Sequence, residues 1–271
     1  MKPELGQRKA RRFIESLPAV GRYHFDSAEA RAALGETAAK FTLSRLARQG
    51  AIASPARGFY VVVPPEYRAL RCLPADQFIP ALMEQLGLGY YAGLLTAAQY
   101  HGAAHQRPQE FQVVLDKPRR AIECGRVRVA FVTRRRLRDV PTQRLNTPRG
   151  VLLISTPEAT AVDLVGYQHR AGGLGHVATV LAELAEKVEP EKLAAAAATA
   201  ALPWAQRLGY LLERVGAGEK LGPLKAYVRA RAHESVMLFP SATRSGVLRA
   251  NRTERSEDWK LFINGDVEAD L

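Results

Sequence analysis

Cysteine is almost absent from this sequence, which has only Cys72 and Cys124 among its 271 residues. The two stand far apart and form no C-x-x-C pair, so neither a disulfide scaffold nor a cysteine zinc site is expected. Long apolar runs are also missing, because no segment approaches the roughly 18 consecutive apolar residues of a membrane span. The charged segment 1–12 lacks the apolar stretch of a signal peptide. These absences favour a cytoplasmic protein without a membrane partner.

Catalytic motifs are missing as well. His101 and His105 have the spacing of two ligands on one helix face, but the helix is expected to end between them and no third ligand follows. The glycines of 172–175 lack the Lys-Ser/Thr of a phosphate-binding loop, and neither GxSxG nor HExxH occurs. The acidic residues available for a nuclease-like cluster are Asp116, Glu189 and Glu191. Their order in the sequence and their strand context differ from those of a nuclease site. We therefore expect no enzyme activity, no metal and no cofactor.

Positive charge is concentrated in one part of the chain. The net charge is +12, and residues 1–150 hold 25 Lys and Arg against 12 Asp and Glu. Residues 151–271 hold 14 against 15. A uniformly basic surface would not be so asymmetric, so the first part is expected to meet a polyanion. The basic cluster at 134–138 is interpreted as a solvated loop, with a second phosphate contact as the alternative.

The segment 36–63 carries the clearest functional pattern. At about 100° per residue, a helix over 36–49 buries Ala39, Leu43, Leu46 and Ala47 on one side. Its other side has three cations, two hydroxyls and no carboxylate, which suits phosphates and base edges in a DNA major groove. The candidate DNA-binding residues on this side are Thr37, Lys40, Phe41, Ser44, Arg45 and Arg48.

The surroundings of that helix predict a winged helix-turn-helix. A helix over 5–17 ends at Pro18, a short helix through Leu34 follows, and Gly35 turns directly into the basic helix. A hairpin over 52–63 then forms the wing. Arg57 at its tip and Tyr60 on its return strand complete the set of candidate DNA contacts.

The rest of the chain reads as a second, mixed part. Prolines and weak periodicity at 64–74 indicate a domain boundary. Beyond it the pattern predicts helices over 75–86 and 92–101, then short strands, then mainly helices. The expected fold is α+β, with a winged helix-turn-helix DNA-binding domain at 1–68 and a larger mixed α/β C-terminal domain at 69–271.

Four stretches in this order resemble one protein family. They are RGFYVVVPPEY at 57–67, YYAGLLTAAQYHGAAHQRPQEFQVVL at 90–115, TPEATAVDLV at 156–165 and QRLGYLLE at 206–213. Together they resemble the AbiEi family, the antitoxins and transcriptional regulators of abortive-infection E, type IV toxin–antitoxin systems. The resemblance covers nearly the whole chain, although no single stretch is as specific as a Walker loop.

The resemblance implies functions that composition and spacing do not. Such proteins bind inverted repeats in their own promoter through the winged helix, often cooperatively, and repress the operon. The C-terminal domain acts as the antitoxin against a nucleotidyltransferase toxin, without needing a stable complex. A monomer in solution that binds double-stranded DNA cooperatively is expected. The alternatives are a nuclease delivered by the winged helix and a plain ligand-sensing regulator without a toxin partner.

Overall fold

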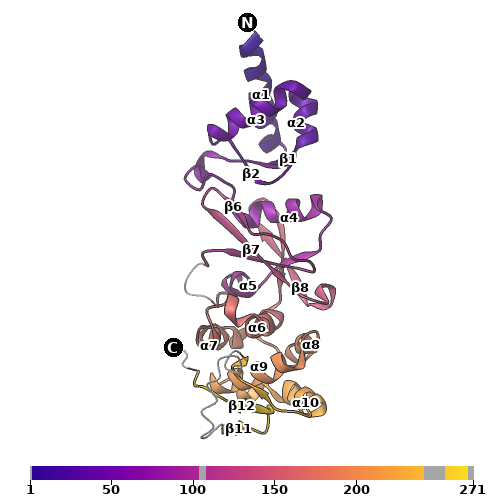
Figure 1. The fold of residues 1–271 in the computed structure, drawn as a ribbon, viewed down its shortest axis with the longest axis vertical. Coiled ribbons are helices and arrows are strands. Elements are labelled where there is room, and N and C mark those ends of the chain that lie inside the picture. The colour runs from indigo at the N-terminus through magenta and orange to yellow at the C-terminus, as the bar shows by residue number, and fades with distance from the viewer. Residues whose placement is uncertain (1, 104–107, 241–253, 268–271) are drawn as a thin grey trace. The chain divides into compact units, whose positions relative to one another are not determined.

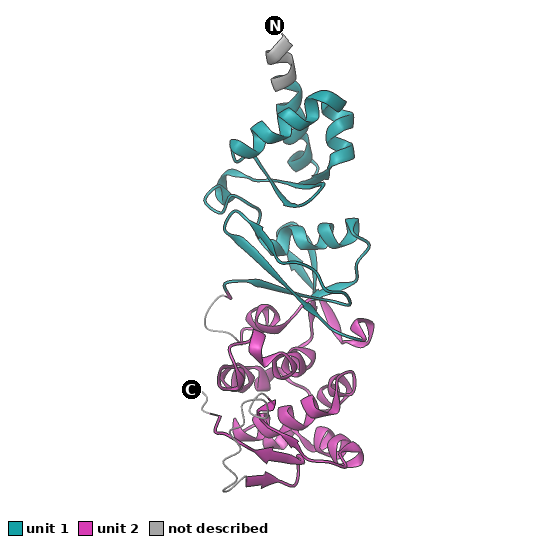
Figure 2. Cartoon of the chain, in the orientation of Figure 1, with its two compact units in different colours: residues 1–91, 109–135, 144–153 teal, residues 92–108, 136–143, 154–271 magenta. Residues whose placement is uncertain are grey.

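The computed structural model describes residues 2–103, 108–240 and 254–267. The chain splits into two compact units (Figure 2). Unit 1 comprises Met1–Tyr91, Gln109–Arg135 and Arg144–Leu153, and unit 2 comprises Ala92–Pro108, Arg136–Gln143 and Ile154–Leu271. Among the described helices, none has the length and apolarity to cross a membrane. The boundary between the predicted DNA-binding domain at 1–68 and the predicted C-terminal domain at 69–271 stays a prediction.

Three helices and a three-stranded sheet open unit 1 (Figure 1). The elements are α1 (Lys2–Ala19), β1 (His24–Asp26), α2 (Ser27–Leu34), α3 (Glu36–Arg48), β2 (Ile52–Ala56) and β3 (Phe59–Val62). The strand order is β1-β3-β2, with both pairs antiparallel. This confirms the predicted arrangement of helix, helix-turn-helix and hairpin. The pattern missed β1, whose three residues are too few to show alternation, and α1 continues past Pro18.

Local sequence signals explain the sharp start of α2 and α3. The Asp26 carboxylate accepts hydrogen bonds from the backbone N–H groups of Ala28 and Glu29, both at 2.8 Å. In the opposite direction, the Asp26 backbone N–H donates to the Glu29 carboxylate at 3.0 Å, which completes a capping box. Gly35 then turns the chain with φ of +89°, a conformation that strains other residues.

The apolar side of α3 packs as the periodicity predicts, with one exception. Ala39, Leu43 and Leu46 are buried, and the two leucines share a core with Phe25. Ala47 was predicted to be buried but is exposed. It lies about 80° around the helix from Ala39, at the edge of the apolar stripe and in the last turn, where none of the described residues covers it.

A six-stranded sheet follows, in the order β6-β7-β5-β4-β9-β8. Its elements, with the helix that precedes them, are α4 (Ala75–Gln85), β4 (Tyr90–Ala92), β5 (Phe111–Leu115), β6 (Ile122–Cys124), β7 (Val127–Thr133), β8 (Thr142–Thr147) and β9 (Gly150–Ser155). β5 and β7 are parallel, and β6 and β7 are antiparallel. The predicted helix over 92–101 begins two residues late, because 90–92 is a strand. Arg134, predicted to lie in a solvated loop, is only 3% exposed.

The hairpin contributes to two hydrophobic cores of unit 1, the core of the winged helix and a second core shared with α4 and the six-stranded sheet. Phe59, Val61 and Val63 of the hairpin belong to the same cluster of buried side chains as Phe78 of α4 and Val113 of β5. The hairpin therefore has two packed faces. Cutting the chain between the hairpin and α4 would expose this core.

Arg149, in the turn between β8 and β9, reinforces unit 1 from outside the core. Its guanidinium lies 3.7 Å from the ring centroid of Tyr23 and 5.3 Å from that of Tyr67. It also donates to the Glu66 carboxylate at 2.9 Å, and its side chain is only 12% exposed. The β8–β9 turn thereby contacts both the loop between α1 and β1, which contains Tyr23, and the segment after the hairpin, which contains Glu66 and Tyr67.

Removing that side chain is expected to destabilise unit 1. Arg149→Ala loses a largely desolvated cation–π contact and a charged hydrogen bond, so the free energy of unfolding should fall by about 2 kcal/mol. Urea denaturation measures the change. The control is Arg144→Ala, in the exposed part of β8, which should stay within about 0.5 kcal/mol of the wild type. Equal effects of the two substitutions on the free energy of unfolding would contradict the stabilising role of Arg149.

Unit 2 is built around one buried helix. Its elements are α5 (Leu94–Tyr100), α6 (Pro157–Gly166), α7 (Leu174–Leu184), α8 (Pro190–Ala198), α9 (Leu202–Arg214), α10 (Gly222–Arg231), β10 (Val236–Met237), β11 (Glu254–Ser256) and β12 (Leu261–Ile263). α5, α7, α8 and α9 all contact α6 or one another. Every α6 residue from Glu158 to Val165 is buried. Glu158 and Asp163 are therefore interior groups, although acidic residues usually lie at the surface.

Candidate nucleic-acid interface

The predicted polar side of α3 is exposed in the structure. Thr37, Lys40, Phe41, Ser44 and Arg48 are all open to solvent. Phe41 is 75% exposed, which is unusual for a large apolar ring. The face thus has two cations, two hydroxyls and an apolar side chain that can contact a thymine methyl group.

Arg57 lies at the hairpin turn, as predicted. The turn has only two residues, Arg57 and Gly58, and Gly58 has a φ of +78°. The Gly58 carbonyl accepts a hydrogen bond from the Ser27 backbone N–H at 3.1 Å. The turn is therefore docked on the start of α2. Arg57 is therefore an exposed cation that lies beside the helix-turn-helix. A longer wing would instead extend away from it as a free loop.

Tyr60 has a packing role that the sequence did not reveal. Its ring stacks on Phe25 with centroids 5.3 Å apart, and Phe25 meets Phe13 edge to face at 5.1 Å. Tyr60 is partly buried against the core of the winged helix. Its use as a DNA contact stays a prediction.

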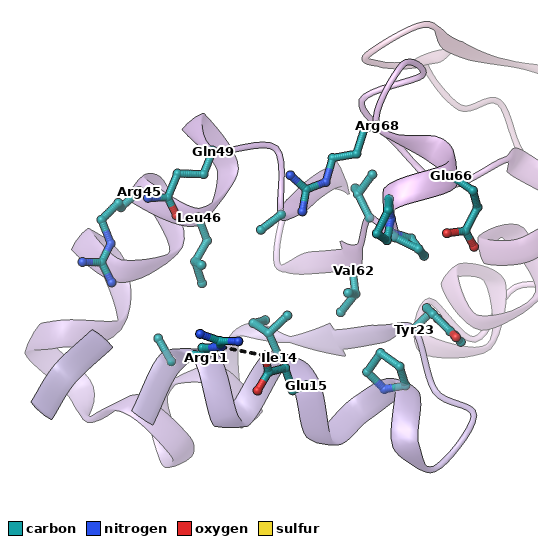
Figure 3. A pocket seen from close by; sticks show the side chains of 16 residues that line it. Arg11, Ile14, Glu15, Tyr23, Arg45, Leu46, Gln49, Val62, Glu66 and Arg68 are labelled. Atoms are coloured by element: carbon teal, nitrogen blue, oxygen red, sulfur yellow. Dashed lines mark hydrogen bonds and ion pairs between the residues drawn. The ribbon is translucent and has the colours of Figure 1, made fainter. Parts of the chain in front are cut away.

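Arg45 differs from the other α3 candidates because it lines a groove of about 810 Å³ within unit 1 (Figure 3). Ile14 of α1, Leu46 of α3 and Val62 of β3 are apolar residues of the lining. The Arg45 Nε atom is buried and has no hydrogen-bond partner among the described residues. Arg68 also lines the groove. The sequence missed this groove because its walls come from three separated segments.

The His101 environment in unit 2 is structural. Its Nε2 lies 2.8 Å from the Ser155 carbonyl and must donate the proton, while the Lys187 ammonium donates to the His101 carbonyl. Ser155 and Thr160 share a hydrogen bond of 2.7 Å between hydroxyls. His105 lies outside the described residues. Within the described part of the chain, no group of three or more His, Cys, Asp or Glu could hold a metal ion.

Burial at this site predicts a pH dependence of stability. Desolvation lowers the pKa of His101 below its ordinary value of 6.5. The unfolded chain therefore takes up the proton more readily than the folded chain, and the free energy of unfolding falls as the pH drops below 6.5. His101→Gln, which can keep an N–H for Ser155, should give a flatter stability curve on acidification. Identical curves in urea titrations would contradict this prediction.

The QRLGYLLE stretch on α9 binds the C-terminal strands of unit 2. Gln206 Nε2 donates to the Lys260 carbonyl at 2.9 Å, and Arg207 Nε donates to the Met237 carbonyl at 3.0 Å. Glu213 accepts from the Trp259 indole N–H at 2.8 Å. A Cβ at Gly209 would lie 2.0 Å from the Trp259 ring. The stretch is thus a docking strip for Trp259, a role that the sequence indicates only by placing a glycine inside a helix.

The fold and this surface define a winged helix-turn-helix protein with a second, helix-rich part. Residues 91–214 match the family model of the AbiEi antitoxin C-terminal domain, which confirms the resemblance and includes the stretches at 156–165 and 206–213. Residues 91–214 are therefore similar to the antitoxin domain of this family.

One solved structure has the same fold. It is the crystal structure of RV2827C protein from Mycobacterium tuberculosis, with a TM-score of 0.66 and 17% sequence identity. The match covers 94% of this chain and 90% of that chain. No curated protein matches the sequence.

Proposed function

We propose that this protein is the antitoxin of a type IV toxin–antitoxin system and represses its own operon. The observation that supports this best is one chain with both an AbiEi antitoxin domain at 91–214 and a winged helix that exposes a basic α3 face. The winged helix binds inverted repeats in the promoter, and the antitoxin domain opposes a nucleotidyltransferase toxin. The protein is a monomer in solution and binds DNA cooperatively.

The α3 face supplies the chemistry for DNA. Lys40 and Arg48 contact phosphates or guanine, and Thr37 and Ser44 make shorter hydrogen bonds. Phe41 contacts a sugar or a thymine methyl group. Arg57 contacts the backbone or the minor groove from the hairpin turn. This assignment explains why Phe41 is exposed among the polar residues of this face.

Arg48 and Arg45 should differ in their effect on DNA binding. Arg48 is exposed on the outer face of α3, whereas Arg45 is half-buried against the groove. If Arg48 reads a base, Arg48→Ala should weaken specific binding by about 1–3 kcal/mol and relax specificity at that position. If it contacts a phosphate, binding weakens evenly and the salt slope falls by about one. Gel shifts on the promoter measure both.

Arg45→Ala is the matched comparison for that experiment. It removes the same charge from the same helix but should cost less affinity, because Arg45 is half-buried and lines the groove. Unchanged binding by Arg48→Ala would overturn the assignment of the α3 face.

The antitoxin activity is tested in cells. The gene next to this one, if it encodes a nucleotidyltransferase, is expressed alone and together with the full chain. Growth restored by co-expression supports the proposal, and continued growth arrest with folded protein present contradicts it. Incubation of the protein with plasmid and Mg²⁺ or Mn²⁺ should leave the DNA intact, since a nuclease would cut it.

A further inference from the structure

The two cysteines of the chain lie together inside unit 1. Cys72 and Cys124 stand 52 positions apart in the sequence, yet both are buried in the same hydrophobic cluster. Cys72 is fully buried and Cys124 is 7% exposed. Their side chains hydrogen-bond to one another, and both are free thiols.

The backbone segments that hold the two cysteines are in direct contact. The Arg126 N–H donates to the Leu70 carbonyl at 2.8 Å, so the two segments run side by side. Leu70 lies two residues before Cys72, and Arg126 lies two residues after Cys124. A disulfide needs Cα atoms about 4.4–6.8 Å apart, so only segments in such close contact can form one.

Glycine at position 125 permits this close approach. A Cβ there would lie 2.2 Å from the Leu70 carbonyl oxygen, and Gly125 has a φ of +60°. The turn between β6 and β7 can therefore pack directly against residues 70–71, which follow the winged helix.

We infer that Cys72 and Cys124 are a redox-active dithiol that a hydroperoxide converts into an intramolecular disulfide. The Cys124 thiolate attacks the peroxide, whose O–O bond breaks; Cys124 becomes a sulfenic acid and the peroxide leaves as water or an alcohol. Cys72 then attacks that sulfur, an S–S bond forms and water leaves. The two thiols lose two electrons, and the peroxide gains them.

The surroundings assign the two roles. The hydrogen bond from Cys72 lowers the pKa of Cys124, and the backbone N–H of Ser54 acts in the same direction. The same hydrogen bond and burial raise the pKa of Cys72. Cys124, the more exposed of the two, is therefore the attacking thiolate, and Cys72 is the resolving thiol.

The bond would join parts of unit 1 that meet at the hairpin. Ser54 lies in β2, and its N–H contacts the Cys124 sulfur. The disulfide would tie the segment after the winged helix to the β6–β7 turn beside that strand. This inference goes beyond the proposed function and does not depend on it.

Mass spectrometry of the full, reduced chain treated with hydrogen peroxide tests the inference. We expect a loss of ~2 Da, a peptide cross-link between residues 72 and 124, and full reversal by dithiothreitol. The oxidised chain should also melt about 5 °C higher, because the bond closes a long loop. Peroxide that adds oxygen to one cysteine without forming the cross-link would overturn the inference.

Two variants separate the roles. Cys72→Ser should leave Cys124 as a sulfenic acid, a gain of ~16 Da that dimedone traps. Cys124→Ser should leave Cys72 unmodified at the same dose. Equal reactivity of Cys72 in the Cys124→Ser protein would overturn the assignment. Should either variant fail to fold, the wild-type cross-link and its reversal decide the result.

Discussion

Gly209→Ala is expected to unfold the C-terminal strands of unit 2. The new Cβ would stand 2.0 Å from the Trp259 ring, which is fully buried. α9 cannot move away, because the side chains of Gln206 and Arg207 donate hydrogen bonds to backbone carbonyls of the C-terminal segments. Gln206 donates to the Lys260 carbonyl and Arg207 donates to the Met237 carbonyl. Displacing the indole also breaks its hydrogen bond to Glu213. The free energy of unfolding should fall by about 3 kcal/mol, measured by urea denaturation.

Gly222→Ala is the control for that experiment. Gly222 begins α10 in the same unit, and a Cβ there would meet no atom of the described structure within 4 Å. Alanine favours the helix, so stability should be unchanged or slightly higher. A Gly209→Ala protein as stable as the wild type would show that Trp259 is not seated on α9.

Reversing two charges on α3 is expected to abolish promoter binding. Lys40→Glu with Arg48→Glu removes two cations from the proposed interface and places carboxylates against phosphates. Affinity should fall at least ~100-fold, and the dependence of affinity on salt should weaken by about two phosphate contacts. Fluorescence anisotropy with a labelled promoter duplex, titrated at several salt concentrations, measures both quantities.

The matched control reverses Arg135 and Arg138, which are also exposed. It changes the net charge by the same amount but lies in the cluster interpreted as a solvated loop. Binding near the wild-type level supports a local interface on α3. A comparable loss would show that the DNA contact extends to this loop or depends on net charge alone.

Periodicity predicted the winged helix because its signals are local. The capping residues Asp26 and Glu29, the turn at Gly35 and the alternation on the hairpin all act within a few residues. The strands β1, β4 and β8 were missed. β1 and β4 have three residues each, too few to show alternation, and β8 has Leu145 as its single apolar residue.

Burial of polar groups was the hardest feature to predict. Glu158 and Asp163 have charges that usually mark a surface, yet neighbouring helices enclose α6 on all sides. Arg45 has the spacing of a DNA contact, but its position beside α1 turns it to the groove (Figure 3). Tyr60 follows the hairpin pattern, but its stacking on Phe25 depends on the tertiary fold. Such features come from packing between distant segments.

The shared core of unit 1 decides how the two proposed activities can be separated. A chain starting near residue 70 would lose Phe59, Val61 and Val63 and leave their partner Phe78 uncovered. Loss of antitoxin activity in such a fragment would then reflect misfolding. Surface substitutions on α3 of the full chain avoid this problem, because the side chains of Lys40 and Arg48 lie outside the core.

The full-length Lys40→Glu, Arg48→Glu protein therefore tests most directly whether repression and antitoxin activity reside in different parts of the chain. A promoter reporter and growth rescue against the nucleotidyltransferase are measured in the same cells, with protein levels matched to the wild type. We predict that the reporter is fully derepressed and that rescue equals the wild type. Retained repression, or loss of rescue by the folded variant, would contradict the account.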